Sequence, residues 1–288
     1  TNNLQARVAA VLGIGTGDFG YGQSVSSGQV TVGAIADNDD LSDIYADMLK
    51  IGVHQTGTAP TLIALINDSD LIGDETSTGT DSTLKGIADF ENLMSVYEAN
   101  RFVLHASQAI LTSVASSSRT TSWNGSITSV FNASWSSSDE LRNFFNTGGQ
   151  VRFTASRSGG SSTAKNSDWT ALLASMGTVR FGIASTSSTG TGVETAIGYT
   201  DLTSTYQDVF AQQGSSYAEN RYVVKARLQS PTTIQFSVQF EDIDTGNGTG
   251  VEIDEDVDGT IQTVTTQYRA AGTYITAISG NYTAISNL

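Results

Sequence analysis

The residues in this sequence with the most chemical potential are carboxylates, and many of them gather in one segment. Glu241–Asp258 holds eight carboxylates and no Lys or Arg. Oxygen ligands of this kind are what Ca²⁺ prefers. The candidate calcium ligands are Asp242, Asp244, Asp254, Asp256 and Asp258. Asp242 and Asp244 are spaced like the opening of a calcium loop, but the later Asp/Asn, Gly and Glu positions are not filled in order. A solvated hairpin tip is the preferred interpretation, with calcium binding as the alternative.

Two carboxylates can also hydrolyse a glycoside when they stand about 5–10 Å apart and one of them lies in an apolar pocket. Acids crowded at one polar turn are poorly placed to differ in environment, so the segment does not favour this chemistry. Asp139 and Glu140 stand at an expected helix start, where free backbone amides favour negative charge. Helix capping therefore explains this second pair.

Histidine is the usual base for a serine nucleophile and the commonest zinc ligand, and the chain has only His54 and His105. His54 follows an expected helix and is predicted to cap its carbonyl end. His105 is expected on a polar or interface face of a long helix. The sequence has no Cys for a thiolate site and no Gly-x-Ser-x-Gly nucleophile elbow. We predict no enzymatic activity, no cofactor, and no catalytic or metal-binding residues.

Trp123, Trp135 and Trp169 are the residues that could stack on a sugar, as in lectins. Each lies in an alternating or helical apolar stripe, where tryptophan is usually a core residue. We expect all three in the core, and a glycan-binding surface remains the alternative.

The glycine-rich segment 13–33 superficially suggests a phosphate-binding loop. No Gly-Lys-Ser/Thr follows it and no strand precedes it, so nucleotide binding is not expected. The preferred interpretation is an extended arm, whose glycines let the backbone lie close against a neighbouring subunit.

The charge of the chain limits its partners. The formal net charge is −15, only 15% of residues are charged, and Ser, Thr, Gly and Asn fill much of the remainder. A strongly acidic surface repels phosphates, so we expect no nucleic-acid partner. No apolar run approaches 18 residues and no signal-peptide pattern is seen, which predicts a soluble protein without a membrane partner.

Helical periodicity marks the first part of the chain. The expected helices are 4–12, one from Asp39 or Asp40 to about Gly52, and a long one from about Asp81 to Leu111. The long helix would extend roughly 45 Å. The polar stretch 116–122 is the expected boundary between a helical region with its glycine-rich arm, 1–115, and a second domain, 123–288.

Alternation with a period of two marks the second part, which predicts half-buried strands. The expected strands are 123–135, 151–156, 179–185, 222–228, 234–240, 260–269 and 273–278, with a five-residue hairpin turn at 229–233. The expected short helices begin near Asp139, at Asn166 or Ser167, and near Leu202. The fold class is therefore α+β: a helical N-terminal region, then a mainly antiparallel sheet or sandwich domain with short helices.

Four stretches resemble virion structural proteins of marine T4-like and related tailed phages. These are DELRNFFNTGGQVRFTASR at 139–157, VLGIGTGDFGYGQ at 11–23, the helix leading into VHQTG at 53–57, and the acidic stretch 240–260. The resemblance implies a non-enzymatic component of the tail, neck or baseplate that forms homo-oligomers and docks to other virion proteins. A capsid decoration or tail-fibre protein is the first alternative, and a carbohydrate-binding adhesin is the second.

Overall fold

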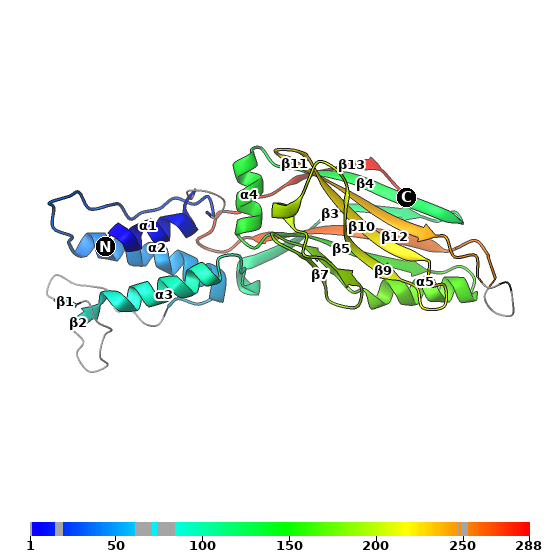
Figure 1. The fold of residues 1–288 in the computed structure, drawn as a ribbon, viewed down its shortest axis with the longest axis horizontal. Coiled ribbons are helices and arrows are strands. Elements are labelled where there is room, and N and C mark those ends of the chain that lie inside the picture. Colours follow the sequence, from blue (N-terminus) through cyan, green and yellow to red (C-terminus); the bar gives the residue numbers. More distant parts are fainter. Residues whose placement is uncertain (1, 15–19, 61–70, 74–83, 247, 249–252) are drawn as a thin grey trace. The chain divides into compact units, whose positions relative to one another are not determined.

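The computed structural model describes the chain except for residues 1, 15–19, 61–70, 74–83, 247 and 249–252 (Figure 1). The chain forms two compact units. Unit 1 comprises Thr1–Ile110, Arg142–Gly148 and Arg269–Ile278, and unit 2 comprises Leu111–Leu141, Gly149–Tyr268 and Ser279–Leu288. The division after residue 110 lies a few residues before the boundary expected at 116–122. Two later segments also return to unit 1, which no local sequence pattern indicated.

Unit 1 is built on three helices that pack against one another (Figure 1). Its elements are α1 (Asn2–Leu12), α2 (Asn38–Thr56), β1 (Leu71–Gly73), β2 (Leu84–Gly86), α3 (Ile87–Ala99) and a 3₁₀ turn (Ala106–Gln108). One apolar stripe from each helix enters a common core, which confirms the first two predicted stripes. Fully buried members include Val8 of α1, Met48 of α2 and Met94 of α3.

The expected bounds of α2 need correction. Asp37, not Asp39 or Asp40, caps the helix, because its carboxylate accepts from the Asp40 amide while Asp40 bonds back to the Asp37 amide. The helix continues past Gly52 and ends at Gly57, whose φ of 79° closes the last turn. Gly52 is a packing glycine, since a Cβ there would collide with the hydroxyl of Tyr97.

The single long helix expected over 81–111 is wrong for the described part. Residues 81–83 lie outside the described residues, α3 ends at Ala99, and β3 (Ala109–Arg119) has begun before Leu111. Beyond the helix the backbone makes tertiary bonds instead of helical ones: the His105 amide donates to His54 O, and the Ala271 amide donates to Gln108 O. The polar stretch 116–119 belongs to β3, the terminal strand of its sheet.

Unit 2 is a sandwich of two antiparallel sheets, which confirms the predicted fold class. The six-stranded sheet has the order β13 (Asn281–Ser286), β4 (Gly125–Ser134), β11 (Thr233–Asp242), β10 (Arg221–Ser230), β9 (Gln207–Gln213), β8 (Val193–Glu194). The five-stranded sheet has the order β3, β12 (Thr260–Ala270), β5 (Gln150–Ser158), β6 (Val179–Phe181), β7 (Thr186–Ser188). The sequence Val-Arg-Phe occurs at 151–153 in β5 and again at 179–181 in β6. These two segments pair antiparallel, with Val151 opposite Phe181.

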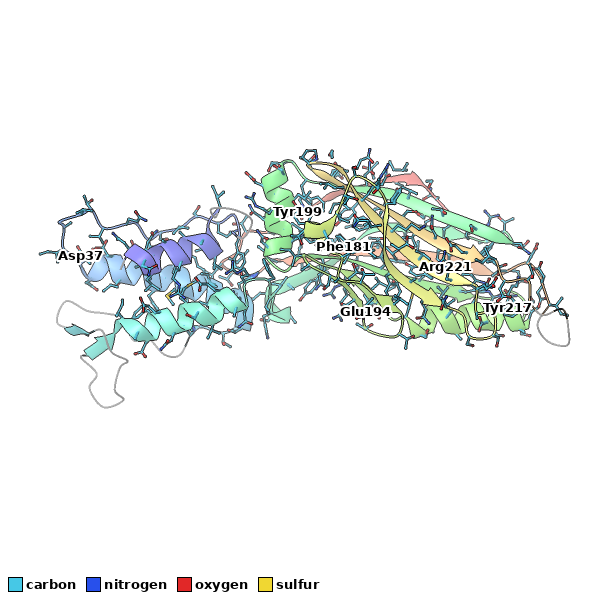
Figure 2. The ribbon with its side chains drawn as sticks, in the orientation of Figure 1. Asp37, Phe181, Glu194, Tyr199, Tyr217 and Arg221 are labelled. Atoms are coloured by element: carbon cyan, nitrogen blue, oxygen red, sulfur yellow. The ribbon has the colours of Figure 1, made fainter. Side chains whose placement is uncertain are left out.

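Aromatic rings hold the two sheets face to face. Phe236 of β11 stacks on Phe131 of β4 within one sheet, with centroids 5.4 Å apart. The same ring meets Phe153 of β5 at 5.4 Å and Phe181 of β6 at 5.2 Å in the other sheet. Phe181 is labelled in Figure 2. Helix α5 (Ala164–Ser175) contacts strands of both sheets. The alternation read from the sequence therefore identified the core-facing side of these strands.

The short helices and the β10–β11 turn differ more from the sequence predictions than the long strands do. Helix α4 (Ser138–Asn146) and the glycine turn into β5 are as predicted, whereas Thr163 caps α5 in place of Asn166 or Ser167. The predicted helix over 202–210 is wrong: Val209 and Phe210 lie in β9, paired with β10. The hairpin between β10 and β11 has only Pro231 and Thr232 outside the strands.

The predicted strand over 273–278 is also wrong. The segment runs through bends in unit 1, where the Thr276 amide donates to the Gln23 side chain and takes no part in a ladder. The last strand is β13 instead.

Candidate functional site

The acidic segment does not present its carboxylates as one site. Asp258 accepts from Arg157 Nη2 at 2.9 Å, from the Ser161 amide at 3.0 Å and from the Asn166 side chain. These contacts hold the pKa of Asp258 below its usual value, with the Ser161 amide as the largest cause. Arg157 thus supplies a cation that the segment itself lacks.

A second cation, Lys165 in the first turn of α5, is buried beneath the same segment. Its Nζ lies 3.2 Å from Asp242 Oδ2 and 2.9 Å from Asp254 Oδ1. The side chains of Lys165 and Asp242 are both fully buried, and that of Asp254 is 43% exposed. Asp242 Oδ1 accepts from Asn220 Nδ2 at 2.6 Å and from Trp169 Nε1 at 3.3 Å. We call Lys165, Asp242, Asp254, Asn220 and Trp169 the Lys165 cluster.

Burial and charge act in opposite directions within the Lys165 cluster. Burial raises the pKa of Asp242, although Lys165, Trp169 and Asn220 favour its ionised form. Burial lowers the pKa of Lys165, but hydrogen bonds and charges from Asp254 and Asp242 leave it above its ordinary value. The Lys165 hydrogen bond also lowers the pKa of Asp254. The preferred interpretation of the segment as a solvated tip is wrong for Asp242, which is an interior group.

The remaining calcium candidates do not gather around a common metal position among the described residues. Asp244 accepts the amides of Glu219 and Gly246. Within the described residues, no group of three or more His, Asp or Glu side chains is arranged to hold a metal ion. Part of the segment, 247 and 249–252, lies outside them.

The two histidines have structural contacts that the sequence did not reveal. His54 lies inside the last turn of α2, not after it, and its Nε2 meets the carbonyl of Thr147, which follows α4, at 3.0 Å. Burial lowers its pKa from 6.5 to about 4. His105 caps the 3₁₀ turn, with Nδ1 accepting from the Ser107 amide, so its expected place in a long helix is wrong.

The tryptophans are core residues, as predicted. Trp123, Trp135 and Trp169 are 5%, 5% and 1% exposed. Trp123 and Trp169 meet edge to face at 5.3 Å. None of the three can offer a ring face to a sugar from outside, so the residues named for glycan stacking do not form such a surface.

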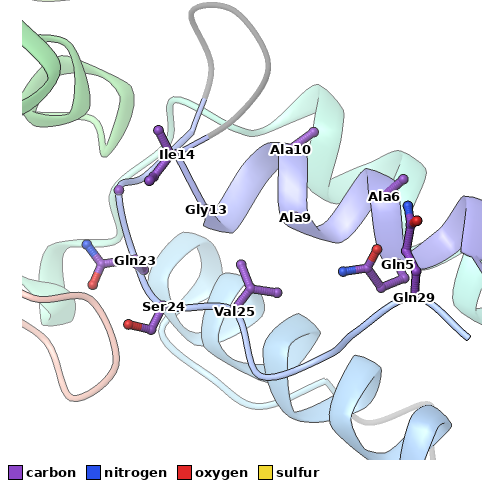
Figure 3. Close-up of a pocket in the computed structure, with 11 residues that line it drawn as sticks. Gln5, Ala6, Ala9, Ala10, Gly13, Ile14, Gln23, Ser24, Val25 and Gln29 are labelled. Carbon is purple, nitrogen blue, oxygen red and sulfur yellow. The ribbon is translucent and has the colours of Figure 1, made fainter.

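A cavity lies in unit 1, between α1 and the segment that follows it (Figure 3). Its volume is about 730 Å³, and its walls include Ala6, Ala9 and Ala10 of α1 and Val25 opposite. Its described lining carries no charged side chain and no histidine.

The glycine-rich segment is anchored by side chains. Its residues 15–19 lie outside the described part, and the rest has no helix or strand. The Ser26 and Ser27 amides donate to the Asp47 carboxylate, and the Asn2 side chain bonds both the amide and the carbonyl of Val30. A turn then closes from Ala34 N to Thr31 O. At that turn Val32 is 99% exposed, and Ile35 just beyond it is 88% exposed. We call residues 31–35 the apolar tip.

The two lateral edges of the sandwich differ. At one edge, Thr186 of β7 and Thr195, next to β8, exchange backbone hydrogen bonds of 2.9 and 3.2 Å. Glu194, labelled in Figure 2, also accepts the Ser188 amide at 2.6 Å. These bonds join the margins of the two sheets, so this edge is closed.

The opposite edge is formed by β3 and β13, which are the terminal strands of their sheets. We call this pair the open edge. Between Arg101 and Asp139 the sequence has one formal charge, Arg119, and it has none after Arg269. Leu111 and Ile285 are each 55% exposed on these strands. Lys, Pro and bulges are the usual protections of an edge strand. Neither strand contains a Lys or Pro, although the pairing of β13 with β4 shifts register between Ala284 and Ser286.

Comparisons with known proteins add no relatives. Among the described helices, none combines the length and apolar character needed to cross a bilayer. No protein-family model, curated protein sequence or solved structure matches this chain significantly.

Proposed function

We propose that this protein is a non-enzymatic structural component of a tailed-phage virion, associated with the tail, neck or baseplate. It acts by oligomerising and by docking to other virion proteins, and its place of action is the virion. Four stretches of the sequence, at 11–23, 53–57, 139–157 and 240–260, support the phage assignment because they resemble virion structural proteins of tailed phages.

The open edge is the observation that carries the assembly role. The chain has a net charge of −15, so two copies repel each other over most of their surface. Strands β3 and β13 are the terminal strands of their sheets and form an almost uncharged surface with exposed Leu111 and Ile285. An edge strand pairs readily with a strand of another chain. A second copy is the partner that we assign to this edge, through antiparallel pairing of β3 with β3.

The apolar tip supports a second contact, with other virion proteins. Val32 and Ile35 are almost fully exposed on a segment that Asn2 and Asp47 hold in place. Exposed apolar side chains on an anchored turn favour insertion into a partner, because burying them there removes apolar surface from water.

Mass photometry of the purified chain tests the oligomerisation. We expect an oligomer in the wild type and a monomer in Ser116→Glu, which places like charges on the paired β3 strands. Val193→Glu on the closed edge is the matched control and should leave the oligomer intact, since Val193 is also an exposed edge-strand residue. A monomeric wild type, or an unchanged oligomer in Ser116→Glu, would contradict the role of the open edge.

Attachment to phage parts tests the location. We expect the oligomer to bind isolated tails and not empty capsid shells in electron micrographs. Binding to shells would favour capsid decoration instead, and a trimer without binding to either part would favour a fibre.

A further inference from the structure

The Lys165 cluster places a buried amine against a buried carboxyl group, together with the groups that amide formation requires. We propose that Lys165 Nζ and the side-chain carboxyl carbon of Asp242 join in an intramolecular amide bond, formed by the folded protein itself. This inference does not rest on the proposed virion function.

The reacting groups have the necessary positions. Lys165 Nζ lies 3.2 Å from Asp242 Oδ2, and both side chains are fully buried. An amine is a nucleophile when it loses its proton, and a carboxyl group is an electrophile when it gains one. Burial raises the pKa of Asp242 and so favours its protonated form, whereas Asp254 and Asp242 hold the pKa of Lys165 above its ordinary value. The neutral amine and acid are therefore the minor form of the pair, and direct contact at 3.2 Å lets a proton pass from Lys165 Nζ to Asp242 Oδ2 to reach it.

The other oxygen of Asp242 faces donors that suit a developing negative charge. Oδ1 accepts from Asn220 Nδ2 and Trp169 Nε1, which form an oxyanion hole for the tetrahedral intermediate. The orientation of Asn220 is fixed, because its Oδ1 accepts the amides of Ile243 and Asp244, at 2.8 Å each. Its amino group is therefore directed to Asp242.

Asp254 is placed to carry protons. Its Oδ1 lies 2.9 Å from Lys165 Nζ, and the contact with Lys165 keeps it ionised. Tyr217 positions this segment, since its hydroxyl bonds both the amide and the carbonyl of Ile253 at 3.1 Å. The Tyr217 ring, labelled in Figure 2, lies 5.5 Å from Lys165 Nζ and covers the amine.

The reaction balances without an added reagent. Lys165 passes one proton to Asp242 Oδ2, and the free amine then attacks the carboxyl carbon. Asp254 accepts the second proton from Nζ and returns it to the same oxygen. The bond from carbon to Oδ2 breaks, one water molecule leaves, and an amide joins α5 to β11. Asp254 ends in its starting state.

Intact-mass spectrometry of the denatured full-length protein tests the proposal. We expect the mass of the sequence minus one water molecule. Trypsin should fail to cleave after Lys165, and a branched product should join peptide 158–180 to peptide 228–269. Fragmentation should place the branch on Asp242. The full sequence mass with normal cleavage after Lys165 would overturn the proposal and leave a buried ion pair. A branch on Asp254, or loss of ammonia through Asn220, would overturn it as well.

Substitutions distinguish the proposed amide bond from the ion pairs around it. Lys165→Arg keeps the positive charge but cannot form this amide, so it should show the full mass. Lys225→Arg removes a lysine whose ion pair with Asp208 is partly exposed, and it should retain the loss of water. In Asp254→Asn the linked fraction should be smaller just after purification and should increase with time. Equal linkage in Asp254→Asn and wild type at the earliest time would remove Asp254 from the mechanism.

Discussion

The Nε2 atom of His54 and the carbonyl oxygen of Thr147 lie 3.0 Å apart in the interior of unit 1. A neutral imidazole with its proton on Nε2 satisfies this contact. The other ring nitrogen, Nδ1, is buried and has no hydrogen-bond partner among the described residues. Protonation would therefore place a charged N–H where nothing described accepts it, which agrees with the lowered pKa.

This contact predicts a pH dependence of stability. The folded-state pKa of His54 is about 4 and its ordinary value is 6.5. Between these values the unfolded state binds more protons, so stability is fully present above pH 6.5 and is lost as the pH falls toward 4. The loss is about 3 kcal/mol. His54→Gln keeps a donor for Thr147 but does not titrate, so urea unfolding should show a flatter pH profile. His105→Gln is the control and should retain the wild-type slope; equal slopes in all three proteins would contradict the assignment.

Asp168 is predicted to stabilise the loop that carries Tyr217. Its carboxylate accepts from the amides of Ser215, Ser216 and Tyr217. Asp168→Ala leaves these amides without that acceptor and should lower the free energy of unfolding by about 2–3 kcal/mol. Asp208→Ala removes a surface ion pair with Lys225 and should cost less than about 1 kcal/mol. Chemical denaturation measures both, and similar losses would contradict the prediction.

Gly52 is predicted to be a packing position. Gly52→Ala gains helix propensity of about 1 kcal/mol, but its Cβ meets the Tyr97 hydroxyl, and overpacking of this kind costs about 1–3 kcal/mol. We expect a net loss of thermal stability in Gly52→Ala and partial recovery in the double variant with Tyr97→Phe. Gly28→Ala is the control, since a Cβ there meets nothing within 4 Å. If the effects of Gly52→Ala and Tyr97→Phe on thermal stability are additive, contact between these two residues is not the cause of the loss.

Calcium is predicted to have no effect on stability. Asp242, Asp254 and Asp258 are already bound to Lys165 or Arg157, and a metal ion would have to displace these cations. The melting temperature should stay constant when calcium is titrated to millimolar concentration. A rise that disappears in Asp244→Asn or Asp256→Asn would restore the calcium interpretation.

The periodicity of apolar residues was sufficient to predict those helices and strands that bury one face. The stripe Leu41, Ile44 and Met48 predicts α2, and the alternation of Ile234, Phe236 and Val238 predicts β11, because each repeat places apolar side chains on one face. The same logic failed at Val209 and Phe210. Their spacing fits a helix, but pairing of β9 with β10 decides the structure.

The Lys165 cluster could not be predicted from local sequence, because Lys165 and Asp242 are 77 residues apart. One signal was available. A start of α5 at Thr163, rather than at Asn166 or Ser167, places Lys165 in the first turn, where the helix dipole disfavours a cation. With that start, a carboxylate partner for Lys165 is expected, and the acidic segment Glu241–Asp258 contains candidates.

The paired Thr186 and Thr195 restrict how subunits can be joined. The sandwich has one margin, formed by β3 and β13, at which strands can be added, so the proposed twofold pairing of β3 would occupy that margin in both molecules. Growth through sheets stops at two copies. A larger assembly would therefore need a different surface, and the turn with the exposed Val32 is the one that we propose for that step.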